Sequence, residues 1–497
     1  MNHLILKNNQ TISLSSIPEL DYPSFMEQNL SAVKGPGCHC VNYFGFPHKD
    51  KIKLICCIAD DESHSILISS TVADKMQSLA SFTAHNLAFE KFERELHENY
   101  GINFPDHPWL KPVRYPFNAS NKNSTIANYP FFKIESEELH EVGVGPIHAG
   151  IIEPGHFRFI CNGEQILHLE IQLGYQHRGI EQLFLKKKKL LQRITLAENI
   201  AGDTVAGHSV AFANCWESLC GFHANRNLLF VRTLALELER IAIHTADLSG
   251  LCTDIGYQLG SAVFGRLRTP VINFFQSWCG NRLAKGLIRA GKNNFPFTKE
   301  LAELLIKLLD EYEPDFDAMS EELFSLPSAL ARFEKTGVVT NGQAMAIGLV
   351  GMAARTTGII RDIRSSHSHD LYHELDHHPI IKHHGDVYSR AQIRRREIKQ
   401  SISYIRKLME NFPKEERRNE LTAPGPDSFS ISLVEGWRGE ICHCAITDDN
   451  GELAHYKIKD PSFHNWLALA LSVRNNEISD FPVCNKSFGL SYCGHDL

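Results

Sequence analysis

The stretch from Leu228 to Asp247 constrains the fold more than any other part of this sequence. Leu228, Val231 and Ala235 begin an apolar stripe at helical spacing, and further apolar residues occupy the other faces. A helix of this kind is buried nearly all round, so the chain must build a helical core about it. A polar stripe on the same helix consists of Glu237, Arg240, His244 and Asp247. These polar groups must be paired internally or face a partner.

The length and the charge exclude several classes of protein. A chain of 497 residues can form roughly two to four domains. Its formal net charge of -7 gives no basic field for nucleic acid, so no nucleic-acid partner is expected. The longest strongly apolar run, residues 344–354, is too short to span a bilayer. No glycine-rich phosphate loop is present, so any nicotinamide cofactor is expected on another subunit.

The thirteen cysteines do not form a metal or disulfide pattern. No C-x-x-C pair occurs anywhere, so scattered reduced cysteines are favoured over a disulfide framework.

The order of predicted elements gives an α+β fold class. Residues 1–120 read as a small α+β domain, with a strand near 51–59 and a helix that ends on Gly101. Residues 121–140 form an Asn- and Ser-rich linker, and 141–497 form the main domain. Its core, from about 180 to 412, is mainly helical and flanked by small sheets. Further helices are predicted over 341–364 and 387–412, and a hairpin over 429–459.

A turn rich in glycine and proline precedes a predicted hairpin and holds His148, Glu153 and His156. Because glycine and proline restrict the backbone there, the three side chains are candidates for a proton relay or a polar pocket. The alternative is that the histidines only cap the turn.

Seven histidines lie between His367 and His384. His369, His373 and His377 repeat every four residues, as helical metal ligands can. Since no cysteine accompanies them and prolines or aromatic residues interrupt the run, a solvated loop is the favoured interpretation.

Seven ordered motifs carry a resemblance to a known family. They are "GPIHAGIIEPGHFRF", "GYQHRGIEQLF", "IAIHTADLSG", "RTTGIIRDIR", "GDVYSR", "VEGWRGE" and "KDPSFHNW". From about Val142 onward the chain resembles the large subunit of energy-converting (group 4) NiFe hydrogenases and its relative, the quinone-pocket subunit of respiratory complex I. The segment from Phe92 to Pro116 resembles the small peripheral subunit of complex I. The chain is thus similar to a fusion of the two, as in the formate hydrogenlyase large subunit.

The sequence departs from the hydrogenase pattern at the metal ligands. The family holds nickel and iron with two C-x-x-C pairs, whose places are taken here by Ala201, Thr204, Ser462 and Asn465. A methyl, a hydroxyl or an amide group cannot replace soft thiolates. We therefore expect no NiFe centre, no hydrogen turnover and no metal bound by this chain, as in the metal-free, hydrogenase-related complexes.

The resemblance also assigns roles to other residues. Arg178 and His244 match positions beside the terminal 4Fe-4S cluster of a partner subunit. Asp247 matches the carboxylate that orients a pocket histidine, for which His156 is the candidate. Glu153 matches the hydrogenase glutamate that passes protons, and His148 would stand with it at the mouth of the cavity.

Two functions follow from the resemblance. In the first, the chain is a subunit of a membrane-anchored, ion-translocating oxidoreductase and passes electrons from the partner's cluster to quinone or another acceptor. In the second, it couples or scaffolds such a complex without turnover. A cavity of a few hundred Å³ lined by the predicted residues would favour the first function, and a collapsed cavity filled by apolar side chains would favour the second. The expected partners are a small iron–sulfur subunit, a ferredoxin-like subunit and ion-pumping membrane subunits, on the cytoplasmic face of the membrane.

Overall fold

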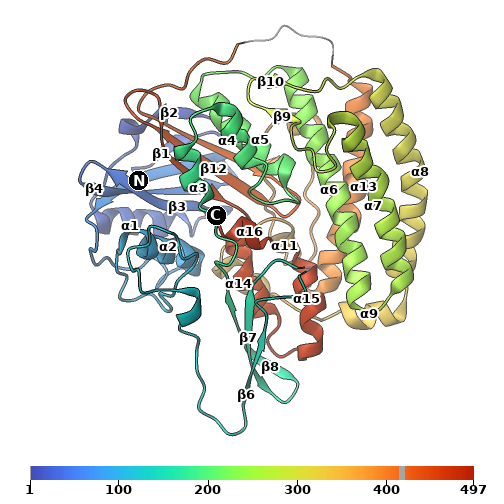
Figure 1. Cartoon of the computed structure of the whole chain (residues 1–497), viewed down its shortest axis with the longest axis horizontal. Coiled ribbons are helices and arrows are strands. Elements are labelled where there is room, and N and C mark those ends of the chain that lie inside the picture. The colour runs from blue at the N-terminus through green and yellow to red at the C-terminus, as the bar shows by residue number, and fades with distance from the viewer. Residues whose placement is uncertain (1, 151, 414–419) are drawn as a thin grey trace.

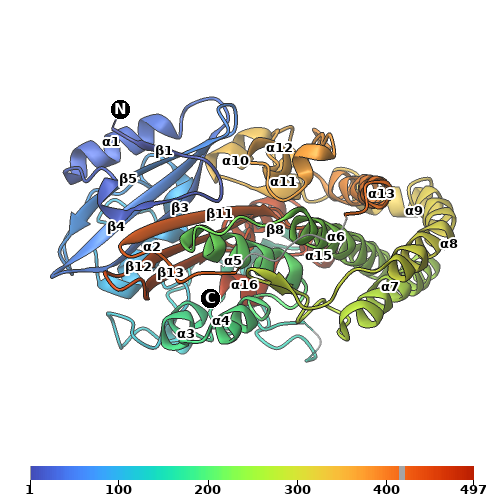
Figure 2. The same ribbon diagram turned by 90° about the horizontal axis from the view of Figure 1, so that it is seen from above.

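Two sheets and a helix bundle form the body of the protein. The computed structural model describes residues 2–150, 152–413 and 420–497. Figure 1 shows the N-terminal sheet at one end, the bundle at the other, and a small sheet that projects below them. The view from above in Figure 2 shows the same separation of sheet and bundle. The expected α+β fold class, with a mainly helical core flanked by small sheets, is confirmed.

Two four-stranded sheets pack face to face. The first has the order β1 (Leu4–Leu6), β5 (Ser65–Ala73), β4 (Lys51–Asp60), β3 (Cys38–His48). The second has the order β13 (Leu453–Lys459), β12 (Glu440–Thr447), β11 (Ser428–Glu435), β2 (Thr11–Ser13). One apolar core lies between them, and α1 (Tyr22–Ala32), α2 (Glu90–Tyr100) and α5 (Val205–Leu219) cover their outer faces. Because β4 and β11 are covered on both faces, their sequences are apolar almost throughout.

The strand β2 connects the two halves of the chain. Its residues Thr11 to Ser13 pair antiparallel with Ser430 to Ser428 of β11. An N-terminal segment therefore completes a sheet that is otherwise built from the C-terminal part. The domain division at residues 121–140 stays a prediction.

The helical core contains a four-helix bundle. It is formed by α6 (Arg226–Asp254), α7 (Gln258–Cys279), α8 (Lys299–Leu323) and α13 (Val387–Glu410). The predicted helices around 228–247 and 387–412 are thereby confirmed, and α6 is buried over most of its length as expected. The remaining helices are α3 (Ile180–Lys186), α4 (Leu190–Ala197), α9 (Pro327–Phe333), α10 (Asn341–Ala346), α11 (Gly351–Arg355), α12 (Ile363–Ser366), α14 (Ser462–Ser472), α15 (Phe481–Phe488) and α16 (Tyr492–His495).

Small antiparallel sheets complete the fold. The projecting sheet has the order β6 (His140–Val144), β7 (His156–Asn162), β8 (Gln165–Gln172), with the expected turn at Gly163. The strands β9 (Ile288–Arg289) and β10 (Lys292–Asn293) form a short hairpin. Among the described residues, no helix is both long enough and apolar enough to cross a membrane.

The single helix predicted over 341–364 is wrong, because the structure divides it into α10, α11 and α12. Gly348 and Gly351 have φ of +66°, and Gly358 has φ of +90°, so the chain turns at these positions. A Cβ atom on Gly351 would lie 2.2 Å from the carbonyl oxygen of Arg438 and from the Gly439 Cα. This close approach of two backbones joins a glycine turn to the β11–β12 turn.

We predict that Gly351→Ala destabilises the protein by at least about 2 kcal/mol, because the left-handed backbone and the contact with the β11–β12 turn both exclude a side chain. Urea unfolding of the two proteins measures this difference. Gly342→Ala is the matched control, since Gly342 lies in α10 with open space at its Cβ position. That variant should gain about 0.5–1 kcal/mol. Equal stabilities for the two variants would contradict the packing described here.

Candidate functional site

The loop from Asn199 to Thr204, between α4 and α5, is the centre of the candidate site. Arg178 lies on one side of it and donates hydrogen bonds to the carbonyl oxygens of Asn199 (2.6 Å) and Ile200 (2.9 Å). On the other side, the Trp437 indole donates to the carbonyl oxygen of Asp203 at 2.8 Å. The loop that would carry the first pair of metal ligands is thus fixed from both sides.

Arg438 lies beside this loop. Its guanidinium donates to both carboxylate oxygens of Asp203, at 2.7 and 2.5 Å, and to the Thr204 hydroxyl at 2.8 Å. It also lies 4.0 Å from the centre of the Trp437 ring. Although burial opposes the charge, Asp203, Asp460 and Asp247 raise the pKa of Arg438. A permanent positive charge therefore occupies the site.

The four residues predicted to take the places of the metal ligands are buried, and three of their side chains bond to other groups of the chain. Ala201 and Thr204 are fully buried, and Thr204 accepts from Arg438. The Ser462 hydroxyl accepts from the Ser491 amide at 2.9 Å. Asn465 bonds to the amide and the carbonyl of Val350, each at 3.2 Å. These oxygen and nitrogen groups, beside a fixed guanidinium, do not fit a nickel–iron centre.

A chain of buried polar groups leads away from the same place. His208 lies 3.0 Å from an Asp460 carboxylate oxygen and 3.1 Å from His443, whose other nitrogen lies 2.8 Å from the Tyr456 hydroxyl. Burial, and then His208, hold the pKa of His443 well below its usual range. Burial acts to raise the pKa of Asp460, but His208 and Arg438 keep that pKa below its usual value. The chain thus joins a neutral imidazole to an ionised carboxylate.

The turn before β7 places its two histidines on backbone carbonyls. His148 Nε2 lies 2.8 Å from the carbonyl oxygen of Gly155, and His156 Nδ1 lies 3.1 Å from that of Gly145. The imidazoles therefore join the two ends of the turn, as the capping alternative expects. A proton-relay role for His148 and His156 stays a prediction.

Glu153 and Arg178 meet at Cys493. The Glu153 carboxylate contacts the Cys493 thiol, and burial followed by this carboxylate raises the pKa of that thiol to about 12. Arg178 approaches the carbonyl oxygen of Cys493 at 3.5 Å. Two of the predicted residues from distant parts of the sequence thus share one neighbour in α16.

His244 and Asp247 lie on the buried stripe of α6, and both are paired within the chain. His244 Nε2 lies 2.7 Å from a Glu397 oxygen, and burial lowers the His244 pKa to about 4. Asp247 pairs with Arg394 at 3.0 Å and with Lys486 at 3.2 Å. Burial works to raise the Asp247 pKa, but these cations keep it lowered. The structure does not bring Asp247 to His156, whose ring bonds to Gly145 instead.

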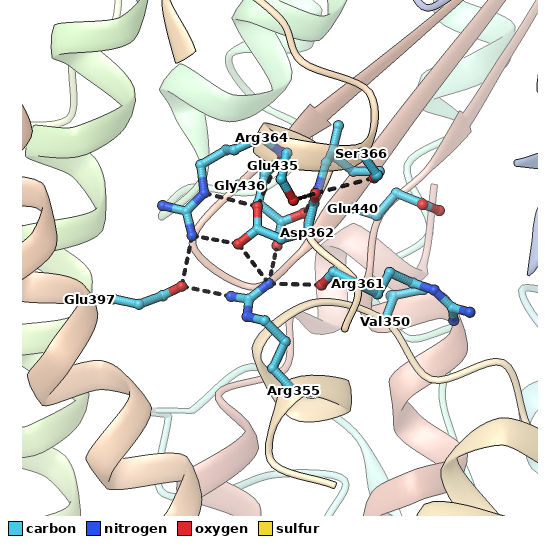
Figure 3. Close-up of polar contacts among 12 residues, drawn as sticks. Val350, Arg355, Arg361, Asp362, Arg364, Ser366, Glu397, Glu435, Gly436 and Glu440 are labelled. Carbon is cyan, nitrogen blue, oxygen red and sulfur yellow. Dashed lines mark hydrogen bonds and ion pairs between the residues drawn. The ribbon is translucent and has the colours of Figure 1, made fainter. Parts of the chain in front are cut away.

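A network of buried ion pairs lies behind the site (Figure 3). Arg355 donates to Glu397 at 2.6 Å and to Glu435 at 2.8 Å, and lies 3.2 Å from Asp362. Arg364 donates to Glu397 at 2.9 Å and to Asp362 at 2.7 Å. All of these side chains are at most 1% exposed.

Arg240 and Glu237 extend the network to the β11–β12 turn. Arg240 lies 3.4 Å from Glu237 and donates to the carbonyl oxygens of Glu435 and Gly436, at 2.9 and 3.1 Å. The network then has four carboxylates, on Glu237, Asp362, Glu397 and Glu435, against three guanidinium groups, on Arg240, Arg355 and Arg364. Burial, and then Asp362, raise the pKa of Glu435 to about 7. One carboxylate therefore exceeds the number of guanidinium groups, and Glu435 is the carboxylate that binds a proton most readily.

The histidines from His367 to His384 do not converge. His369 contacts Asp370 (2.7 Å), His377 contacts Tyr404 (2.8 Å) and His373 is 61% exposed. In the part of the chain that the structure describes, no three His, Cys, Asp or Glu side chains are arranged to hold a metal ion.

The residues that sequence reasoning missed are Arg438 and Glu397. Arg438 lies in the quoted motif "VEGWRGE" but received no role. Glu397 follows Arg390 and Arg394 at four- and three-residue spacing on the buried face of α13. Because charged residues occur all along this helix, the rule that identified the polar stripe on the apolar helix α6 does not single out Glu397.

Comparisons with known proteins give the relationships of the chain. Residues 254–425 match the family described as "Respiratory-chain NADH dehydrogenase, 49 Kd subunit". Hydrogenase-4 component G of Escherichia coli is 26% identical over 86% of this chain and 77% of its own length. The membrane-bound hydrogenase subunit alpha of Pyrococcus furiosus is 25% identical, over 70% of this chain and 85% of the relative. An NADH-quinone oxidoreductase subunit of Chloroherpeton thalassium is 28% identical, over 70% of this chain and 85% of the relative.

The chain is related to both kinds of protein. The resemblance inferred from the seven motifs is thereby confirmed, on the hydrogenase side and on the NADH dehydrogenase side.

We predict that Arg355→Met destabilises the protein by about 3–5 kcal/mol, because it leaves Asp362, Glu397 and Glu435 without their shared cation. Urea unfolding of the purified chain measures the loss. The control is Arg266→Met, which removes an exposed pair with Asp315 and should cost less than about 1 kcal/mol. If both variants lost the same small amount, the network would not hold the core together.

We predict a pH-dependent effect of His244→Gln. In the folded protein the His244 pKa is about 4, below the usual 6.5, so the unfolded chain takes up a proton that the folded chain refuses. Stability from the neutral imidazole is thus present above pH 6.5 and is lost as the pH falls toward 4. The variant lacks this loss. As the pH falls through that window, its free energy of unfolding relative to that of the native protein should therefore rise by about 1.4 kcal/mol for each pH unit. Urea unfolding at several pH values tests this, with exposed His373→Gln as the control. Parallel pH curves for native protein and His244→Gln would refute it.

Proposed function

We propose that this chain is a peripheral subunit of a membrane-anchored, ion-translocating oxidoreductase of the respiratory type. The support is its relationship to subunits of hydrogenase and NADH-quinone oxidoreductase complexes. Its partners are then a small iron–sulfur subunit, a ferredoxin-like subunit and ion-pumping membrane subunits. They hold it on the cytoplasmic face of the membrane, and any NADH chemistry lies on another subunit.

Within that complex the chain couples rather than catalyses. The observation that carries this proposal is Arg438, whose guanidinium fills the place beside Asp203 and Thr204 where the relatives' metal ligands would begin. The oxygen and nitrogen groups beside this guanidinium do not fit a nickel–iron centre, so hydrogen turnover is not part of the proposal.

The partner's 4Fe-4S cluster supplies electron transfer, and this chain supplies the charges around it. Arg178 presents a cation that has no carboxylate partner within ion-pair distance among the described residues. Added negative charge nearby favours proton binding by buried groups, and Glu435, with a pKa of about 7, and His244 are the groups that respond. Arg240 bonds to Gly436, so a change in the network reaches the turn that holds Trp437 and Arg438.

Electron transfer to quinone or another acceptor is the second candidate. It is favoured by the group formed by Glu153, Cys493 and Arg178, because Glu153 and Arg178 are partly exposed beside the loop at Ile200. An acceptor at that edge would meet a carboxylate able to pass protons and a fixed cation.

We predict that Arg178→Gln lowers the midpoint potential of the partner's cluster by ~10–60 mV, because the lost cation stabilises the reduced cluster. His244→Ala should change the slope of the midpoint potential against pH. Redox titration of the purified complex, followed by electron paramagnetic resonance, measures both quantities. His373→Ala, at an exposed position, is the control.

Unchanged titrations for both Arg178→Gln and His244→Ala would overturn the placement of this chain beside the cluster. Adding 2,3-dimethyl-1,4-naphthoquinone to the reduced complex separates the two candidates. Cluster oxidation that slows in Glu153→Gln would favour electron transfer at this chain, and an unaffected rate would favour coupling alone.

A further inference from the structure

A cavity of about 190 Å³ lies where α2 meets β8 and α14. The helix α14 lines it with Trp466, Leu467 and Ala470. Ser462 and Asn465, at the start of the same helix, contact Ser491 and Val350 instead. No role in the proposed function falls on this cavity, so it is a separate feature of the protein.

The walls of the cavity are largely aromatic and aliphatic. They include Val113, Tyr129, Phe132, Leu169, Leu173 and Trp466. Apart from Tyr129 and Phe132, each of these side chains is at most 5% exposed, so the walls belong to the packed interior. An apolar cavity of about 150 Å³ accepts benzene. The volume here therefore suits a planar molecule of one or two rings.

The acidic groups at the cavity already have cationic partners. Glu90 pairs with Arg94 at 3.3 Å. Glu170 pairs with Lys111 at 2.5 Å and also accepts the Phe132 amide at 2.8 Å. No acid at the cavity therefore requires a cation from a ligand.

Two cations at the cavity lack such a partner. Among the described residues, no carboxylate lies within ion-pair distance of the Lys91 ammonium, which is 5.7 Å from the centre of the Phe463 ring. Arg474, at the exposed rim, contacts the His168 ring at 3.4 Å rather than a carboxylate. Burial lowers the pKa of Lys91 to about 7, which an anion beside it would reverse. A partly buried cation without an acid favours an anionic ligand.

We propose that this cavity binds a small aromatic carboxylate, with its ring system against the Trp466 wall and its carboxylate on Lys91. The apolar walls favour a ligand with a ring system, and the unpaired ammonium favours a negative charge on that ligand. A neutral molecule of the same shape would keep the first interaction and lose the second.

Isothermal titration calorimetry on the purified full chain tests this with 2-naphthoate and its neutral counterpart, 2-naphthamide. The native protein should bind 2-naphthoate more tightly than 2-naphthamide. Lys91→Gln should lower the affinity for 2-naphthoate at least about tenfold and leave the affinity for 2-naphthamide unchanged. The substitution removes the positive charge but keeps most of the aliphatic part of the side chain. Lys307→Gln, at a 76% exposed position on α8, should change neither affinity.

Ala470→Phe fills the cavity and should abolish binding of both compounds. If that variant does not fold, the comparison of the two compounds on the native protein and Lys91→Gln decides the matter alone. Absence of 2-naphthoate binding to the native protein would overturn the proposal. Equal affinity of Lys91→Gln and the native protein for 2-naphthoate would do the same.

Discussion

The carboxylate of Glu397 is the contact on which the helical core depends. It accepts from His244 of α6, from Arg355 of α11 and from Arg364 of α12, while Glu397 itself belongs to α13. A buried charge left without its partner costs several kcal/mol, so none of these elements can shift by a turn without a large penalty. The positions of α6, α11, α12 and α13 are therefore set by charge pairing as well as by apolar packing. The β11–β12 turn follows, since Arg240 binds its backbone.

The charges beside the Asn199 to Thr204 loop are balanced within the chain. Arg438 pairs with Asp203 of the loop, and Asp460 also helps to hold its charge. A guanidinium holds its charge at all physiological pH values and cannot change its oxidation state. This place in the chain therefore carries a constant positive charge.

Sequence reasoning predicted the elements that a strong periodic pattern defines. The helices α6 and α13, the Gly101 cap of α2 and the C-terminal strands are confirmed because apolar spacing or a glycine fixes each of them locally. It failed over residues 341–364, where apolar spacing suited a helix but Gly348, Gly351 and Gly358 adopt left-handed backbone. The partners of Asp247 and of the two turn histidines could not be predicted, because they depend on which distant segments fold against them.

The pairing of β2 with β11 links the first residues of the chain to the last sheet. If the N-terminal part were produced separately, the β11 edge would lose its neighbouring strand and expose unpaired amide and carbonyl groups. Such an edge can pair with another copy of the chain and cause self-association. Because both parts belong to one chain, the strand that covers this edge is present in the same proportion as the sheet that it completes.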